Sequence, residues 1–166
     1  MMQENVKNSS LKSMVDMWYS KHMTSYTNYL EDTIWCNDRS FYDSSNNGFN
    51  PNGEINKEDI EFRGAYNSDN LTCPNKSDRF TVSEKNGNGA LTYPVGLVTG
   101  VEALLAYSNG SPLSSGYPNW TLSPYDSSDC VIYPIYLNDD VTLSLTLAIN
   151  RRGVRPSVSL RAGMVR

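Results

Sequence analysis

Few of the side chains in this 166-residue sequence could carry out catalysis. A Ser or Cys nucleophile needs a neighbouring base, and the one histidine, His22, falls on the apolar stripe of a predicted helix. Two carboxylate pairs, Asp126 with Asp129 and Asp139 with Asp140, stand in predicted turns, where Asp typically bonds to nearby backbone. Nothing in the pattern sets two carboxylates across a cleft, as glycoside hydrolysis requires. We therefore expect a protein that is not an enzyme and uses no cofactor.

The sequence has three cysteines, Cys36, Cys73 and Cys130. They lack the CxxC spacing of a metal site, so no metal site is predicted. Cys36 and Cys73 lie in similar polar segments, "IWCNDRS" and "LTCPNKS". If they are bridged, the closed loop is worth roughly 4 kcal/mol on the chain-entropy model. Such a bridge would also require an oxidising compartment. The sequence leaves both the disulfide and two separate thiols open.

The composition favours a loop-rich globular protein. Apolar residues make up 39% and charged residues 19% of the chain, with 11 Tyr against 4 Phe. The net charge of -4 and pI near 4.9 argue against a nucleic-acid or anionic-membrane partner. No apolar run approaches the roughly 18 residues that span a bilayer, and residues 1–10 lack the core of a signal peptide. We expect one domain over residues 1–166, without direct membrane insertion.

The N-terminal part of the sequence predicts a helix and then a long irregular region. Over residues 10–23 an apolar stripe recurs at spacings of three and four, through Leu11, Met14, Val15, Trp18 and His22. We interpret this stripe as core packing. Residues 26–36 are a second amphipathic segment that runs into a strand. Residues 37–88 are rich in Asn, Ser, Asp, Gly and Pro, which is typical of turns.

A second helix is predicted to follow a short strand at residues 91–97. Thr99 and Glu102 match the T-x-x-E capping box, in which each side chain accepts the other residue's free backbone N–H. Within the helix Val101, Leu104 and Leu105 are expected to face inward. The sequence Asn109-Gly110 then ends the helix, because both residues tolerate a left-handed conformation.

The C-terminal part reads as successive strands. They are predicted at residues 120–123, 130–137 and 141–149, with a tight hairpin at 138–140. Pro134 places its strand at a sheet edge or at a bulge. The last strand is expected in "GVRPSVSL", residues 153–160, with Gly153 supplying a turn and pairing on only one side near Pro156. This strand is expected to close the scaffold.

Several motifs resemble those of a known family. "GLVTGVEALLAYSNG" resembles a helical segment of formylglycine-generating-enzyme-like domains, "NWTLSP" a following strand, and "GVRPSVSL" their terminal strand. The order of Trp18-Tyr19, "CNDRS", "LTCPN", "DRFTVS", "LTYPVGL" and "GVRP" also resembles bacterial surface domains from gut Firmicutes. The resemblance covers nearly the whole chain.

The resemblance implies an α+β domain of C-type lectin fold. Such a domain has a twisted antiparallel sheet, two flanking helices, long irregular loops, and N- and C-terminal strands side by side. It does not bring an activity with it, because one fold hosts many functions. Formylglycine-generating enzymes bind copper through a cysteine pair, and only Cys130 lies in the C-terminal half. "YPNW" and "WCND" echo lectin calcium motifs in the wrong order and spacing, so no metal is expected.

The residues before the closing strand form a candidate ligand-binding surface. They combine Tyr, Ser, Asn, Asp and Arg, the mixture typical of antibody-like binding surfaces. The same residues are also what turns and sheet edges require, and the sequence leaves both interpretations open. The candidate set is Tyr117, Asn119, Tyr125, Asp126, Ser128, Asp129, Tyr133, Tyr136, Asn138, Asp139, Asn150, Arg151 and Arg152.

Fold, placement and composition together resemble the variable proteins of diversity-generating retroelements. In those systems a reverse transcriptase rewrites adenine positions near the 3′ end of a gene. The resemblance implies a non-catalytic display domain at a cell surface or on a phage particle, binding a protein or glycan through residues 117–152. Two alternatives stay open: the globular head of a pilin-like structural subunit, and an enzyme of the formylglycine-generating type.

Overall fold

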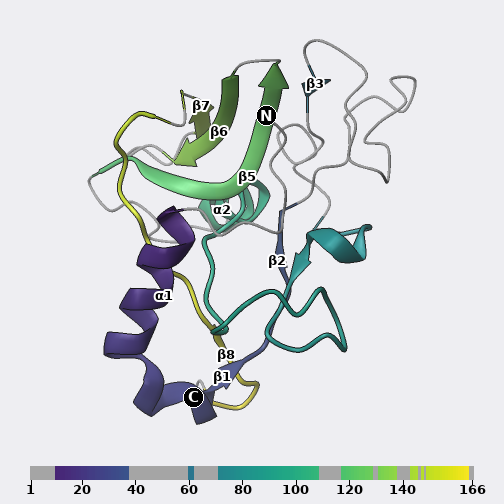
Figure 1. The fold of residues 1–166 in the computed structure, drawn as a ribbon, viewed down its shortest axis with the longest axis vertical. Helices are drawn as coiled ribbons and strands as arrows, with labels where there is room; N and C mark the ends of the chain where they lie inside the picture. The colour runs from purple at the N-terminus through teal and green to yellow at the C-terminus, as the bar shows by residue number, and fades with distance from the viewer. Residues whose placement is uncertain are drawn as a thin grey trace.

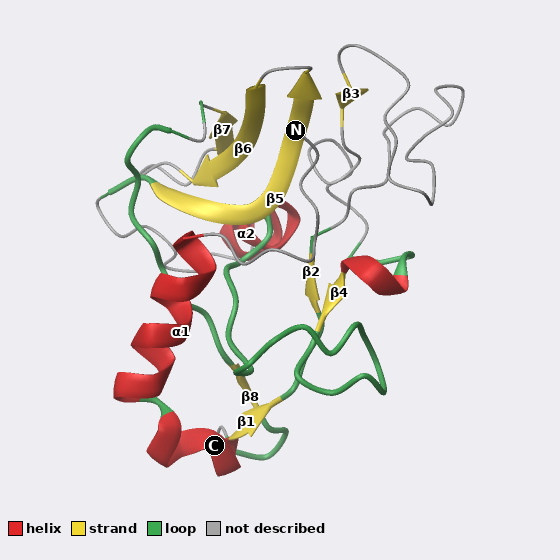
Figure 2. Ribbon diagram, viewed as in Figure 1, coloured by secondary structure: helices red, strands yellow, loops and turns green. Residues whose placement is uncertain are grey.

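The computed structural model describes residues 10–37, 60–61, 71–108, 117–128, 131–137, 143–145, 147 and 149–164. Within these ranges helices and short antiparallel strands make an α+β architecture (Figures 1 and 2). The helices are α1 (Ser10–His22), η1 (Thr24–Tyr29), η3 (Lys76–Asp78) and α2 (Gly100–Ser108). The strands are β1 (Leu30–Glu31), β2 (Trp35–Cys36), β3 (Ile60–Glu61), β4 (Arg79–Phe80), β5 (Asn119–Ser128), β6 (Val131–Leu137), β7 (Leu143–Leu145) and β8 (Ser159–Leu160).

The described strands form one larger and two smaller antiparallel sheets. The larger sheet has the order β3-β5-β6-β7, and the smaller ones pair β1 with β8 and β2 with β4. Figure 2 shows the larger sheet at one end of the molecule, with α2 packed beneath β5 and β6. The β1–β8 pair lies at the opposite end, and α1 runs between the two ends (Figure 1). The predicted α+β class is confirmed at this level.

Helix α1 forms where the periodicity predicts it, but its buried face is centred elsewhere. Val15 and Tyr19 are 2% and 1% exposed, and Trp18 packs against them half-buried. Met14 is 55% exposed and His22 is also exposed, so the inward placement predicted for both is wrong. Met14 lies at the edge of the apolar stripe, and His22 lies in the last turn.

Tyr19, which the predicted stripe omitted, is the largest fully buried side chain among the described residues. Its ring stacks on Tyr93 with centroids 4.7 Å apart, and its hydroxyl is hydrogen-bonded to the hydroxyl of Thr27 at 3.1 Å. Leu30, Val95 and Leu97 complete the buried cluster around it. A tyrosine can occupy such a site because its polar tip has a partner.

Residues 91–97 do not form the predicted strand. Leu91, Val95 and Leu97 are all buried, which explains the apolar pattern, but the backbone turns at Pro94. The N–H of Val95 donates to the carbonyl of Tyr93, a bond that a paired strand could not make. Only Gly96 forms a β-bridge, with Ser157.

The capping box at the start of α2 is confirmed. The Thr99 N–H donates to Glu102 Oε2 at 2.7 Å, and the Glu102 N–H donates to Thr99 Oγ1 at 3.1 Å. Val101 is buried as predicted, while the fully buried Ala103 was not predicted. The predicted helix end at residues 109–110 and the side chain of Leu104 lie outside the described part of the chain.

The proline in β6 lies at a bulge and not at an edge. β6 lies between β5 and β7, so the edge alternative is wrong. Pro134 faces Pro124 of β5, and the register shifts on both sides of that pair. Because neither proline has an N–H, their pairing places both missing donors at one rung of the ladder. The hairpin predicted at 138–140 lies outside the described residues.

The strand predicted at residues 141–149 is described only as β7, Leu143–Leu145. Its predicted end is wrong, because Ile149 lies in a turn and is 86% exposed. The N–H of Asn150 closes that turn by donating to the carbonyl of Leu147 at 2.9 Å.

The closing segment, residues 153–160, makes three separate attachments instead of one continuous strand. Gly153 bridges the start of β5, Ser157 exchanges two backbone hydrogen bonds with Gly96, and β8 pairs with β1. Pro156 lies between these attachments, at a position where the pairing requires no backbone N–H donor. Val154 and Val158 pack against the core cluster. The segment thus joins the larger sheet, the core and the β1–β8 pair.

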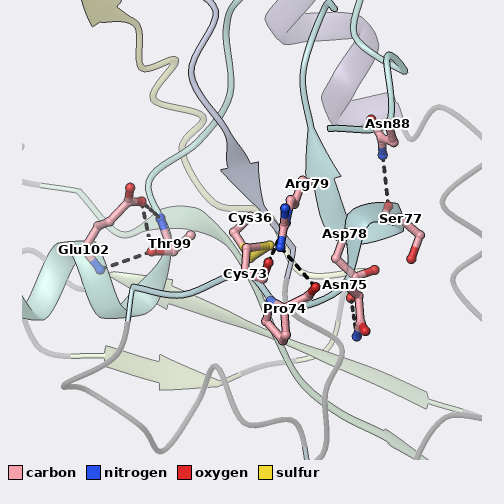
Figure 3. Close-up of a disulfide and its surroundings, with 10 residues drawn as sticks. All are labelled: Cys36, Cys73, Pro74, Asn75, Ser77, Asp78, Arg79, Asn88, Thr99 and Glu102. Carbon is pink, nitrogen blue, oxygen red and sulfur yellow. Dashed lines mark hydrogen bonds between the residues drawn. A yellow bond between two sulfur atoms is a disulfide. The ribbon is translucent and has the colours of Figure 1, made fainter. Parts of the chain in front are cut away.

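A disulfide joins Cys36 of β2 to Cys73, the pairing that the sequence left open. Figure 3 shows Arg79 of β4 beside the bridge. Its Nε donates to the carbonyl of Cys73 and its Nη2 to that of Pro74. Cys36 also pairs with Arg79 in the β2–β4 register. The disulfide and the guanidinium therefore hold residues 73–74 against the same small sheet.

Asp32 anchors the turn that follows β4. Its two carboxylate oxygens accept hydrogen bonds from the N–H groups of Val82 and Ser83, each at 2.8 Å. Charged acceptors strengthen such bonds. We expect Asp32→Ala to lower the free energy of unfolding by about 2 kcal/mol. Urea denaturation would measure this, with Asp32→Asn as the matched control because the amide keeps one acceptor oxygen. Equal stability of wild type and Asp32→Ala would refute the anchor.

Candidate functional site

The predicted surface residues fall on the β5–β6 hairpin and on the two segments at its base. Asn119, Tyr125, Asp126 and Ser128 belong to β5, and Tyr133 and Tyr136 belong to β6. The register places Asp126 opposite Tyr133 and Trp120 opposite Tyr136. Tyr117 precedes β5, and Asn150, Arg151 and Arg152 follow the larger sheet. Asp129, Asn138 and Asp139 lie outside the described residues.

Three of the predicted residues meet at the base of the hairpin. Tyr117, Pro118, Arg151, Arg152 and Gly153 line an open depression of about 250 Å³. Tyr117 is 75% exposed and Arg151 is also exposed, while Arg152 is half-buried. We call this feature the basal depression. It joins two segments that are more than thirty positions apart in the sequence.

Backbone hydrogen bonds fix the two segments to each other. The Gly153 N–H donates to the carbonyl of Pro118 at 2.8 Å, and the Trp120 N–H donates to the carbonyl of Gly153 at 2.9 Å. They form a parallel bridge between Asn119 and Gly153. Asn119 Nδ2 donates to the carbonyl of Tyr117 at 2.6 Å, which holds the backbone of the exposed tyrosine.

Gly153 serves this junction through its size. A Cβ at this position would lie 2.4 Å from Asn119 Oδ1 and 3.2 Å from the carbonyl oxygen of Pro118. Gly153 itself forms a β-bridge, and the turn lies earlier, where the Asn150 N–H donates to the Leu147 carbonyl, so the turn predicted at Gly153 is not found there. Gly153 instead lets residues 151–153 approach β5 closely enough to bond.

The basal depression carries positive charge in a chain whose net charge is -4. Among the described residues that line it, two are arginines and none is acidic. Arg152 Nη1 donates to the carbonyl of Arg151 at 2.9 Å, which fixes one guanidinium against the backbone. The exposed guanidinium of Arg151 is not paired with any residue in the described part of the chain.

The lining residues suit binding better than bond-breaking chemistry. Among the described residues that line the depression, there is no Cys, His, Ser or carboxylate that could act as a nucleophile or general base. No group of three or more His, Cys, Asp or Glu that could hold a metal ion occurs within the described residues. The depression offers guanidinium N–H donors, a phenol and the flat side of a proline.

A second depression, of about 310 Å³, lies beside η3 and was not predicted from the sequence. Lys76, Ser77, Glu84, Gly87 and Asn88 line it. Asn88 Nδ2 donates to the carbonyl of Ser77 at 2.9 Å, as Figure 3 shows. Its residues carry both signs of charge, and the sequence "SEKNGNG" indicates only a turn.

No protein-family model matches this chain, and neither a curated protein nor a solved structure is significantly similar to it. In the part of the chain that the structure describes, no helix is both long enough and apolar enough to cross a membrane. Fold and site together define an α+β domain with a basic, aromatic depression at the base of its main hairpin.

Proposed function

We propose that the chain is a non-catalytic ligand-binding domain of C-type lectin type, which presents residues 117–152 to a protein or glycan. The observation that carries this proposal is the meeting of Tyr117, Arg151 and Arg152 around one depression. Tyr and Arg are, together with Trp, the residues enriched at binding hot spots, because both offer large contact area and directional hydrogen bonds.

The arrangement of the scaffold supports a C-type lectin type of fold. β1 pairs with β8 through Leu30 and Leu160, so strands near the two ends of the described chain lie side by side. The helices α1 and α2 accompany an antiparallel sheet, as the resemblance implies. Gly153 pairs with Asn119 at the start of residues 117–152, Ser157 pairs with Gly96, and β8 pairs with β1, so the end of this binding segment is joined to its own start and to two elements outside it.

The disulfide supports a location outside the reducing cytoplasm, at a cell surface or on a phage particle. Disulfides persist in oxidising compartments and are rare in cytosolic proteins. The Cys36–Cys73 bridge also weakens the formylglycine-generating alternative. That chemistry uses a cysteine pair on copper, and the bridge leaves one cysteine of three as a thiol.

The binding segment is further proposed to be diversified. Its framework attachments use mainly backbone hydrogen bonds, which most side-chain changes leave intact. Residues such as Tyr117 and Arg151 are exposed and can differ without disturbing the core. A retroelement that rewrites adenines near the 3′ end of a gene would change this part of the chain.

The gene itself tests the proposed function. We expect a reverse transcriptase gene nearby, together with a repeat nearly identical to the codons of residues 117–152 that differs at adenines. Among related isolates, substitutions should concentrate in that segment, while residues 10–37 and 71–108 stay nearly constant. A neighbourhood with neither feature, together with substitutions spread evenly along the chain, would overturn the diversification that is part of the proposed function.

A further inference from the structure

The basal depression has a chemistry that narrows the ligand class. On the basis of the binding function proposed above, we infer that it binds a carboxylate-bearing sugar residue, such as a uronic acid within an acidic glycan. Arg151 and Arg152 supply the charge, Tyr117 and Pro118 supply flat surface, and all four line the same depression.

The two arginines are the groups that would bind the carboxylate of the ligand. A planar guanidinium donates two parallel N–H bonds to a carboxylate, and such charge-assisted bonds are stronger than those between neutral groups. The Arg151 side chain is exposed, so it can rearrange toward a ligand. None of the lining residues that the structure describes is acidic, so a carboxylate within the depression meets no like charge from them.

Tyr117 and Pro118 are the residues that would contact the sugar ring of the ligand. The face of an aromatic ring carries partial negative charge, which attracts the partly positive C–H groups of one face of a pyranose. Tyr117 is 75% exposed, and Asn119 holds its backbone through the bond to the Tyr117 carbonyl. The ring is therefore accessible and its attachment point is fixed, which reduces the ordering cost of binding.

The size of the depression favours one sugar residue over a peptide. Its volume of about 250 Å³ is below that of pockets for drug-sized ligands, which begin at about 300 Å³. A stable protein partner covers about 800 Å² on each side, far more than five residues supply. A single acidic sugar can be bound by the depression alone, with the rest of its glycan extending into solvent.

The disulfide-bonded protein, labelled with ¹⁵N, can be titrated with D-galacturonate and D-galactose, which differ in the carboxylate. We expect galacturonate to shift the amide resonances of Tyr117, Asn119 and Gly153, with galactose binding about tenfold more weakly. Arg151→Gln should reduce galacturonate affinity about tenfold and leave galactose binding unchanged. Arg151→Lys, which keeps the charge but loses the planar fork, should give an intermediate affinity.

Lys76→Gln is the matched control, because it removes an exposed cation from the other depression and should bind galacturonate as wild type does. Equal affinities for the two sugars, or galacturonate binding that Arg151→Gln leaves unchanged, would overturn the role of the carboxylate. If an acetylated triglutamate amide shifts the same resonances and binds more tightly than galacturonate, the proposal that the ligand is a sugar would be overturned.

The two proposals fail separately. If neither sugar shifts these resonances while the gene varies in residues 117–152, the ligand class proposed here is wrong and the binding function stands. If galacturonate binds at the basal depression but the gene shows neither template repeat nor localised substitution, the ligand class stands and diversification fails.

Discussion

Removal of the Cys36–Cys73 disulfide is expected to lower the free energy of unfolding by about 4 kcal/mol. The bridge joins residues separated by 37 positions, and a cross-link over such a loop removes many conformations from the unfolded chain. Domains are typically stable by about 5–15 kcal/mol, so this loss would consume much of the total. The Arg79 bonds to Cys73 and Pro74 remain, but they act only once the segment has returned to β4.

Urea denaturation of Cys36→Ser/Cys73→Ser would measure this loss, with all proteins in a Cys130→Ser background so that the third thiol cannot exchange. Dithiothreitol should destabilise the bridged protein by the same amount and leave the double variant unchanged. A double variant within about 1 kcal/mol of the bridged protein would show that the loop is already restricted in the unfolded chain.

Local signals in the sequence predict the elements whose stabilising contacts are local. Helix α1 follows from its periodicity, and the start of α2 follows from the capping box, because Thr99 and Glu102 satisfy each other's backbone within one turn. The segment 91–97 has the sequence pattern of a strand, because its buried side chains alternate, but its backbone does not form one. Its burial depends on α1 and β1, which pack around it from distant parts of the chain.

In the candidate site, too, local features could be predicted from the sequence and long-range contacts could not. Tyr117, Arg151 and Arg152 could be selected by residue type, but not their meeting around one depression. That meeting depends on the parallel bridge between Asn119 and Gly153, a long-range pairing that no local pattern encodes. In the sequence, Gly153 indicates only that the backbone at this position has a special conformation or a close neighbour. The depression beside η3 was missed because turn residues account for its sequence completely.

Two tyrosines with opposite surroundings test whether the buried core and the proposed binding surface differ in their tolerance of substitution. Tyr19 is 1% exposed and stacked on Tyr93, whereas Tyr117 is 75% exposed at the basal depression. The same substitution at both positions removes the same atoms. Its effect on stability should therefore report only the surroundings of each side chain.

We expect Tyr19→Ala to lower the free energy of unfolding by about 3–5 kcal/mol, since it leaves a cavity between Tyr93 and Leu30. Tyr19→Phe should cost about 1 kcal/mol, because it loses only the hydroxyl bond to Thr27. Tyr117→Ala should change stability by less than about 0.5 kcal/mol. Chemical denaturation of the three variants measures this order. If Tyr117→Ala were as destabilising as Tyr19→Ala, residue 117 would belong to the framework and could not vary freely in a display surface.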